Sequence, residues 1–418
     1  MSDLLDLSDR ILDGRADIED HHPFRPTNEL TEVADGTAIV SSFANVTAFG
    51  TDDGLCLVDT GSAFAAPTIH AVVRTWDQSR LHTAVYTHGH IDHVFGTAVF
   101  EEESAAEQWP AARVIGHEAV DPRFDRYVLT AGYNAVINRR QFQMPNLQWP
   151  IEYRRPDVTY RDHLDVEVGG VGFELHHARG ETDDHTWAWV PDRKVLCTGD
   201  LIIWCTPNAG NPQKVQRYAL EWAVALRTMA GLGAEVLLPG HGLPIRGAAN
   251  VAMVLTDTAD LLDSLHDQTV ALMNEGARLS DILHTVAAPP DLLAKPYLRP
   301  IYDEPEFVVR NLWRLYGGWY DGNPANLKPA RDAVLAAEIA SLAGGATKLA
   351  DRALVVADDG DLRLAGHLAE MAALAAPDDP AVHRVRAEVY RRRVDQESSL
   401  MAKGVFGWAV AESQAKLG

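Results

Sequence analysis

The stretch Thr87-His88-Gly89-His90-Ile91-Asp92-His93 directly follows an apolar run at residues 81–86. Its imidazole and carboxylate side chains are the ligands that borderline divalent ions such as zinc prefer. Four such groups on one tight loop cannot all reach a single ion without strain, so we expect the loop to begin two metal sites. His88 and His90 can face the same way and share a first ion, whereas Asp92 and His93 turn toward a second.

The sequence around this loop predicts a layered α/β domain. Three apolar segments between residues 32 and 59 are separated by Asp-Gly turns, which indicates consecutive hairpins. Further on, strand-like and helix-like patterns alternate. The expected strands lie at residues 37–43, 46–49, 55–58, 81–86, 166–176, 186–190, 195–197 and 236–238, and the expected helices at residues 65–80, 92–100 and 218–232.

Beyond residue 249 the strand patterns stop and helical periodicity continues to the C-terminus. The segments at residues 361–376 and 380–393 flank a Pro-Asp-Asp-Pro turn and are typical of an antiparallel helix pair. A chain of 418 residues is long for one domain. We therefore expect two domains, residues 1–250 and residues 251–418.

The composition limits the classes of partner. The chain has 37 basic and 59 acidic residues and a net charge of −22, which argues against a nucleic-acid or anionic-membrane partner. Cys56, Cys197 and Cys205 are expected to be buried free thiols. The N-terminus has no pattern of a signal peptide, and no apolar run is long enough to cross a membrane, so we expect a cytoplasmic protein without stable membrane insertion.

Two further ligand candidates follow short apolar strands, where a layered α/β domain presents its loops. Asp200 follows the run at residues 195–197 and can bridge two ions with its two oxygens. His241 follows the run at residues 236–238 and would complete the second site. Glycines lie beside both residues.

The His-x-His-x-Asp-His pattern resembles the signature of the metallo-β-lactamase superfamily. Most members of that superfamily have a further histidine ligand in a Pro-Gly-His-Thr turn, and here the matching turn is Ala178-Arg179-Gly180-Glu181-Thr182. Glu181 occupies the place of that histidine and is the preferred ligand. His185, four residues later, is the alternative.

A glutamate in this turn is similar to the alkyl sulfatases within that superfamily. Counting through Leu196-Cys197 brings Asp200 onto their bridging carboxylate, which is a glutamate in that family. The run Tyr316-Gly317-Gly318-Trp319-Tyr320-Asp321-Gly322-Asn323-Pro324 looks like part of their dimerisation domain. The resemblance implies a metallo-β-lactamase αββα sandwich followed by an all-α dimerisation domain, two Zn²⁺ per chain and a homodimer. It does not include the sterol-carrier-like domain that commonly follows in longer members.

Substrate contacts are predicted from the same resemblance. Asn134, Asn138, Arg139 and Arg140 are similar to an Asn and Arg-Arg segment that lines the family's pocket, and paired guanidinium donors suit sulfate oxygens. A solvated basic helix end is the alternative interpretation. The family also has Arg and His residues after the bridging carboxylate, which residues 201–214 lack. The polar substitutes in register there are Asn208 and Lys214.

These patterns favour a hydrolase of a small amphiphilic sulfate ester that uses a metal-activated water. Asp92 or Asp200 would orient that water, and His185 is the candidate for protonating the leaving group. A phosphoester or lactone hydrolase on the same scaffold is the first alternative, because the expected Arg and His after Asp200 are missing. A non-catalytic homologue that binds metal or an apolar ligand is the second.

Overall fold

The computed structural model describes residues 4–417, which divide into two compact units. The first unit comprises residues 4–131, Pro150–Gly276 and Asp281–Tyr316. The second comprises Gly132–Trp149, Ala277–Ser280 and residues 317–417. This division differs from a single cut at residue 250, because the long helix α8 (Ala248–Asn274) packs along α7 (Ala219–Ala230) and so joins the first unit.

Two β-sheets form the centre of the first unit. A seven-stranded sheet has the order β1-β2-β3-β4-β5-β6-β7, and a six-stranded sheet has the order β13-β12-β11-β10-β9-β8. The strands of the first sheet are β1 (Leu30–Ala34), β2 (Thr37–Val40), β3 (Val46–Thr51), β4 (Gly54–Val58), β5 (Leu81–Val85), β6 (Arg113–His117) and β7 (Val158–Tyr160). Those of the second are β8 (His163–Val168), β9 (Val171–His177), β10 (Thr186–Val190), β11 (Val195–Gly199), β12 (Val236–Pro239) and β13 (Ile245–Arg246).

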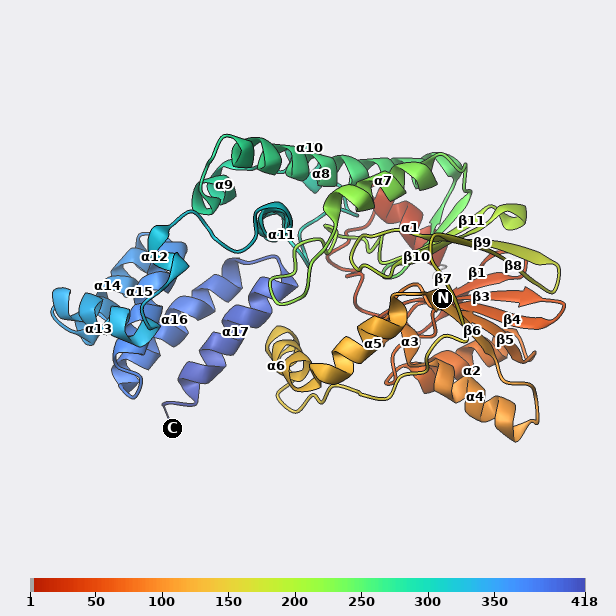
Figure 1. The fold of residues 1–418 in the computed structure, drawn as a ribbon, viewed down its shortest axis with the longest axis horizontal. Coiled ribbons are helices and arrows are strands. Elements are labelled where there is room, and N and C mark those ends of the chain that lie inside the picture. Colours follow the sequence, from red (N-terminus) through yellow and green to blue (C-terminus); the bar gives the residue numbers. More distant parts are fainter. Residues whose placement is uncertain (1–3, 418) are drawn as a thin grey trace. The chain divides into compact units, whose positions relative to one another are not determined.

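Helices cover the outer faces of both sheets (Figure 1). The helices α2 (Ala66–Trp76) and α4 (Thr97–Ala106) contact the first sheet, and α7 and α8 lie along the second. Between the sheets, the rings of Phe49 and Phe173 meet edge to face at 5.1 Å. The first unit is therefore an αββα sandwich, as the sequence predicts.

Hairpins form at the N-terminal part of the first sheet, as expected from the Asp-Gly turns. β1 pairs with β2 across Asp35-Gly36, and β3 with β4 across Asp52-Asp53, in antiparallel registers. β2 also pairs with β3 in an antiparallel register, through a connection without an Asp-Gly pair. From β4 to β7 the pairing becomes parallel. Parallel strands are covered on both faces, which agrees with the burial of every residue of β5 except His82.

The stretch at residues 166–176 is the one strand assignment that the structure corrects. It is a hairpin of two antiparallel strands, β8 and β9, with Val168 opposite Val171. Gly169 and Gly170 form the turn with φ values of +50° and +80°, a backbone conformation that glycine adopts without steric cost. The Gly-Gly pair in the sequence is the turn signal that would have divided this run.

The three cysteines are free thiols and are buried, as predicted. Cys56 lies in β4 and Cys197 in β11, where apolar neighbours surround both. Burial raises the pKa of both thiols above the usual range, which keeps them protonated and unreactive.

The remaining helices of the first unit are shorter than α8. They are α1 (Leu4–Leu12), α3 (Ile91–Val94), α5 (Val120–Leu129), α9 (Leu279–Thr285), α10 (Pro290–Leu293) and α11 (Pro305–Gly317), of which α9 and α11 extend at one end into the second unit.

The second unit is helical and has small side chains in its core. Two buried clusters hold it together, and most of their members are alanines, including Ala353, Ala365, Ala369 and Ala372. Small residues let the helix backbones approach closely, and aspartates cap two of the helices. Its helices are α6 (Ala131–Phe142), α12 (Pro324–Leu327), α13 (Asp332–Leu342), α14 (Ala346–Asp358), α15 (Leu362–Ala375), α16 (Pro380–Gln396) and α17 (Leu400–Gln414).

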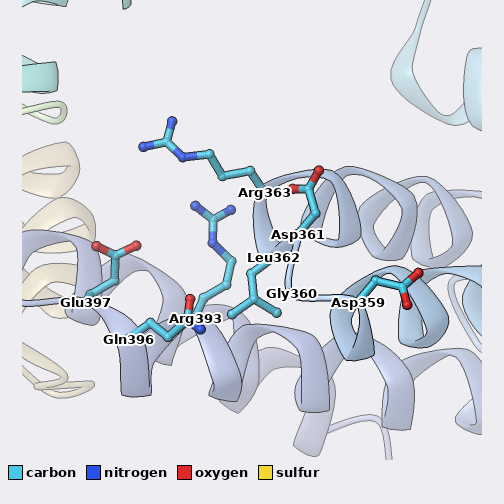
Figure 2. A pocket seen from close by; sticks show the side chains of 8 residues that line it. All are labelled: Asp359, Gly360, Asp361, Leu362, Arg363, Arg393, Gln396 and Glu397. Atoms are coloured by element: carbon cyan, nitrogen blue, oxygen red, sulfur yellow. The ribbon is translucent and has the colours of Figure 1, made fainter. Parts of the chain in front are cut away.

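A polar cavity of about 550 Å³ lies between the start of α15 and the end of α16. Figure 2 shows the guanidinium groups of Arg363 and Arg393 on the same side of this cavity, with carboxylates also among its lining residues. The full lining is Asp359, Gly360, Asp361, Leu362, Arg363, Arg393, Gln396 and Glu397.

Within residues 4–417 no single helix has the length and apolar composition needed to cross a membrane. One bent pair, α13 with α14, passes that test only when the two helices are taken together across an 84° bend.

Candidate metal centre

The polar residues that the sequence singles out lie at the ends of strands in the first unit. His88 and His90 follow β5, and Asp92 and His93 lie on α3, for which His90 is the N-cap residue. Asp200 directly follows β11 and His241 follows β12. Because neighbouring strand ends meet at one edge of each sheet, residues far apart in the sequence converge.

His88, His90, Glu181 and Asp200 form a first group of possible ligands, with one ligand atom from each within 4.8 Å of the others. His88 Nε2 lies 2.8 Å from His90 Nδ1. Glu181 Oε2 lies 3.7 Å from His88 Nε2 and 3.6 Å from His90 Nδ1. Four nitrogen and oxygen atoms therefore converge on one point.

Asp92, His93 and His241 form a second group, and Asp200 joins the two groups. Asp200 Oδ1 lies 3.3 Å from both His93 Nε2 and His241 Nε2, whereas Asp200 Oδ2 lies 3.7 Å from His88 Nε2. Asp92 Oδ2 lies 3.7 Å from the same nitrogens of His93 and His241. One carboxylate thus directs an oxygen to each group, the arrangement of a bridging ligand.

The cluster has the chemistry of a site for divalent cations. His93 Nε2, Glu181 Oε2 and Asp200 Oδ1 are buried and have no hydrogen-bond partner in the described chain, although each faces the cluster. Such atoms are costly to bury unless something binds them. Burial and the nearby charge of Asp200 raise the pKa of Glu181 well above its usual range, a repulsion that bound cations would relieve.

The first two histidines are in the state that binds metal. Burial, followed by the charge of His93, holds the pKa of His88 well below its usual value. Burial, followed by Arg217, does the same for His90. Both rings are therefore neutral at pH 7, with a ring nitrogen free to act as a ligand.

Asp59 holds His93 in place from behind. This buried residue follows β4, and its Oδ2 lies 2.7 Å from His93 Nδ1. The same carboxylate accepts hydrogen bonds from the backbone N–H and the hydroxyl of Thr87, each at 2.7 Å. A carboxylate on the far nitrogen of a ligating histidine fixes the tautomer and the orientation of the ring.

We expect Asp59→Asn to weaken metal binding by about 10- to 100-fold, because an amide orients the His93 ring less well than a carboxylate does. Competition with a chelator of known affinity measures this loss. Asp52→Asn, an exposed position on the preceding turn, is the matched control and should leave the affinity unchanged. Equal affinity in Asp59→Asn and the wild type would contradict the orienting role.

A buried ion pair supports the loop of the first two histidines. The backbone N–H of Gly89 donates to Asp184 Oδ2 at 3.0 Å, and Arg123 Nε lies 2.8 Å from the same oxygen. Arg123 also contacts Asp183. These contacts connect the turn that contains Glu181 to the His88–His90 loop, so the two segments are positioned together.

His185 has a different position from the one expected of a ligand or a proton donor. Its Nε2 accepts a hydrogen bond from the backbone N–H of Asp200 at 3.1 Å, and it is absent from both ligand groups. Burial lowers its pKa to about 4, so the ring is neutral at pH 7. We infer that His185 positions Asp200, because a neutral ring whose Nε2 accepts a hydrogen bond cannot donate a proton from that atom.

The loop after Asp200 supplies an arginine, Arg217, just beyond residues 201–214. Arg217 is 1% exposed, donates from Nη1 to the backbone carbonyl of Glu181 and has its Nη2 3.4 Å from Glu181 Oε1. Asn208 Nδ2 also donates to Glu181 Oε1. Lys214 lies near enough to be affected by Asp92 and Glu181, although burial and then Arg217 dominate and lower its pKa to about 7.

Asp303 anchors this loop to the segment before α11. Its Oδ2 accepts hydrogen bonds from the backbone N–H groups of Gly210 at 2.6 Å and Asn211 at 3.1 Å. Burial raises the pKa of this carboxyl from 3.8 to about 6, and the backbone hydrogen bonds oppose that rise only in part.

The raised pKa predicts a pH effect on stability. Between pH 4 and pH 6 the folded chain binds a proton at Asp303 that the unfolded chain has lost, so the free energy of unfolding falls as the pH rises through this window. The titration of Asp303 accounts for a fall of about 3 kcal/mol in the free energy of unfolding across this window. Asp303→Asn should remove it, and urea unfolding of both proteins at pH 4, 5, 6 and 7 measures the difference. Parallel pH profiles for the two proteins would contradict this assignment.

The four predicted substrate residues at positions 134–140 lie on α6, in the second unit. Asn134 and Asn138 are buried, and Asn138 Nδ2 donates to the backbone carbonyl of Asn134 at 2.8 Å. Arg139 Nε donates to the carbonyl of Leu147 at 2.7 Å. Contact between these residues or Arg140 and a substrate stays a prediction.

An αββα sandwich with a His-rich cluster at its strand ends defines a protein of the metallo-β-lactamase superfamily, and the family model of that superfamily matches residues 41–241. A second model, alkyl sulfatase dimerisation, matches residues 278–416. The chain belongs to the alkyl sulfatase family of the metallo-β-lactamase superfamily.

Several alkylsulfatases resemble the chain along most of its length. A linear primary-alkylsulfatase of Pseudomonas sp. is 28% identical over 368 residues, which cover 81% of this chain and 68% of that protein. An (R)-specific secondary-alkylsulfatase of Pseudomonas sp. is 26% identical, covering 87% of this chain and 59% of that protein. The chain thus spans between about three fifths and two thirds of the length of these relatives.

The fold also matches a solved structure. The stereoselective inverting sec-alkylsulfatase Pisa1 from Pseudomonas sp. superposes with a TM-score of 0.83 at 24% identity, over 92% of this chain and 66% of that chain. A double mutant of the same enzyme gives a TM-score of 0.84. At this identity the match establishes the fold and no more.

Proposed function

We propose that this chain is a metal-dependent hydrolase of alkyl sulfate esters, with two Zn²⁺ ions per chain. The observation that carries the proposal is the convergence of two ligand groups on the two oxygens of Asp200. The ligands of the first ion would be His88, His90, Glu181 and Asp200, and those of the second Asp92, His93, His241 and Asp200. When bound, such ions supply Lewis acidity and make water a nucleophile at neutral pH.

The charges of the site favour an anionic substrate once cations are present. Two divalent ions would carry four positive charges against the three carboxylates of Asp92, Glu181 and Asp200. Arg217 adds a positive charge next to Glu181, and Lys214 is protonated in part at neutral pH because its pKa is lowered to about 7. Guanidinium and ammonium groups suit the oxygens of a sulfate, and we assign Arg217, Lys214 and Asn208 to positioning that group.

An apolar wall beside the second ligand group suits an alkyl chain. The ring of Phe24 lies 4.6 Å from that of His241 and 4.4 Å from that of Tyr302, and Phe43 lies 5.3 Å from His241. The His241 ring is held there by the contact of its Nδ1 with the Phe43 carbonyl. An amphiphilic substrate would place its chain on these rings and its sulfate near Arg217.

Asp92 is the better candidate of the two carboxylates for orienting the attacking water. Its side chain is 20% exposed, whereas that of Asp200 is 6% exposed and directs both oxygens to ligand groups. Of these two carboxylates, Asp92 is therefore the one that solvent water can reach.

The test is release of inorganic sulfate from dodecyl sulfate by the full chain loaded with zinc. A chromogenic phosphodiester and a lactone serve as competing substrates, because these are the alternative classes on the same scaffold. Faster turnover of either would overturn the proposal. Running the reaction in H₂¹⁸O then assigns the bond that breaks, since the label enters the alcohol after carbon attack and the sulfate after sulfur attack.

The first alternative, a phosphoester or lactone hydrolase, arose from the missing arginine after Asp200. Arg217 supplies a buried guanidinium near Glu181, which weakens the reason for that alternative. The second alternative, a non-catalytic homologue, predicts fewer than two ions per chain and no activity after zinc is added, which metal analysis of the same preparation measures.

A homodimer is the proposed assembly. The match to the dimerisation family model supports it, as do the exposed aromatic residues after α11, where Trp319 is 70% exposed and Tyr320 is 38% exposed. Large aromatic side chains are common in interfaces. Sedimentation of the full chain should show a dimer, and a monomer at micromolar concentration would contradict it. The cytoplasmic location and the absence of a nucleic-acid partner stay predictions.

A further inference from the structure

A second cluster of histidines and carboxylates lies on the β8–β9 hairpin, outside the metal centre described above. β8 is the edge strand of the second sheet. In the antiparallel register His163 is opposite His176, and Asp165 is opposite Glu174. Because alternate residues of a strand point to the same side, all four side chains are on one face of the hairpin.

Three of these side chains are close enough to share one ion, and the fourth, Asp165, lies beside His163. Ligand atoms of His163, Glu174 and His176 lie within 4.8 Å of one another, and the two imidazole rings are 4.6 Å apart. His163 Nε2 is 3.0 Å from Asp165 Oδ1, and His176 Nε2 is 3.6 Å from Glu174 Oε2. Two imidazoles with two carboxylates are a ligand set for zinc and its neighbours in the first transition row.

One of the histidines is held in place by the next strand. The ring of His176 stacks on the indole of Trp187 at 4.1 Å with an angle of 13° between the planes, and Trp187 is only 3% exposed. Trp187 is the cross-strand partner of His176 on β10. A fixed ring loses little conformational freedom when it binds an ion, which favours affinity.

The electrostatic surroundings also suit a cation. Burial, and then the charge of His163, lower the pKa of His176, so this ring is neutral at pH 7. Glu167, two residues after Asp165 on β8, places a further carboxylate on the same face of the strand. The side chain of His163 is 42% exposed, so an ion can reach the cluster from solvent.

We propose that the outer face of the β8–β9 hairpin binds a divalent transition-metal ion, with His163, Glu174 and His176 as ligands and Asp165 beside them. This ion is additional to those of the strand-end cluster and shares none of its residues. Bound across two strands, it would fasten the exposed edge strand β8 to β9 and restrain fraying at the edge of the sheet.

The first test counts zinc ions per chain by mass spectrometry after equilibrium dialysis of the full chain against micromolar zinc. His163→Gln should bind one ion fewer than the wild type, whereas His367→Gln, an exposed histidine on α15, should bind the same number. The readout is the difference in ion count between variants, so it does not depend on whether the strand-end cluster also binds ions. A failure of the proposed hydrolase activity would therefore leave this test unaffected.

The second test uses the indole that stacks on His176. Cu²⁺ added to the zinc-loaded chain should quench the fluorescence of Trp187. The contribution of Trp187 is the quenching that is lost in Trp187→Phe, and the same amount of quenching should be lost in His163→Gln. Amide hydrogen exchange of β8 should slow when zinc is added to the wild type but not to His163→Gln. An unchanged ion count in His163→Gln, or quenching and exchange that do not depend on His163, would overturn the proposal.

Discussion

Asp200→Asn is expected to reduce hydrolysis to background. The carboxylate is the one group that faces both ligand groups, with Oδ1 3.3 Å from His93 Nε2 and His241 Nε2 and Oδ2 3.7 Å from His88 Nε2. An amide has the same size but no charge, and its NH₂ group cannot act as a ligand. The loss in kcat/KM should exceed the roughly 100-fold upper limit typical of an outer-shell partner such as Asp59.

Sulfate release and metal content should be measured on the same preparation of Asp200→Asn. The expected result is lower occupancy together with lost turnover, while circular dichroism shows an unchanged fold. Asp192→Asn, an exposed aspartate on the turn between β10 and β11, is the matched control and should keep full activity. Wild-type turnover by Asp200→Asn would exclude a bridging role for this residue.

Gly240→Ala is expected to reduce the activity of the same centre although none of the candidate ligands is replaced. A Cβ atom at Gly240 would lie 2.1 Å from Asp200 Oδ1 and 2.7 Å from the carbonyl carbon of Gly199, far inside contact distance. Because Gly199 is backbone and cannot move aside, Asp200 must shift. A displacement of about 1 Å can cost about 100-fold in rate, and overpacking of this kind costs about 1–3 kcal/mol of stability.

Gly231→Ala provides the comparison for this substitution. Gly231 is the C-cap residue of α7, with φ −77° and ψ −10°, and its nearest contact for a Cβ atom is 3.4 Å away. Both substitutions add the same methyl group, and neither glycine has a positive φ. A large loss of activity in Gly240→Ala alone would locate the effect at Asp200. Equal activity in both variants would show that the strand end adapts without moving its carboxylate.

Much of the candidate metal site was predictable, because its possible ligands lie where local sequence signals are strong. His88, His90, Asp92 and His93 lie on one loop after an apolar run, and the structure places two of them in each ligand group. The position of Glu181 followed from comparison with a known turn. Its preference over His185 agrees with the geometry, in which His185 contacts the backbone of Asp200.

The residues that the sequence did not reveal support the site from a distance along the chain. Asp59 has the same kind of signal as Asp200, since both directly follow a buried strand, and a search of every strand end would have found it. Arg217 lies three residues beyond residues 201–214, the stretch after Asp200 in which the sequence offers Asn208 and Lys214. Its importance comes from burial against Glu181, which sequence spacing does not express.

The sequence by itself indicated a layered α/β domain, the helical half that follows it and the kinds of ligand available, because periodicity and strand-end polar residues are local properties. The αββα order of the layers was implied by the family resemblance. Only the tertiary structure showed that the candidate ligands converge in two groups, that Asp59 contacts His93 from outside those groups, and that α8 packs with the sandwich. The contacts of Asp200 with His88 and His93 join segments more than 100 residues apart, and they are fixed by packing of the two sheets rather than by any local pattern.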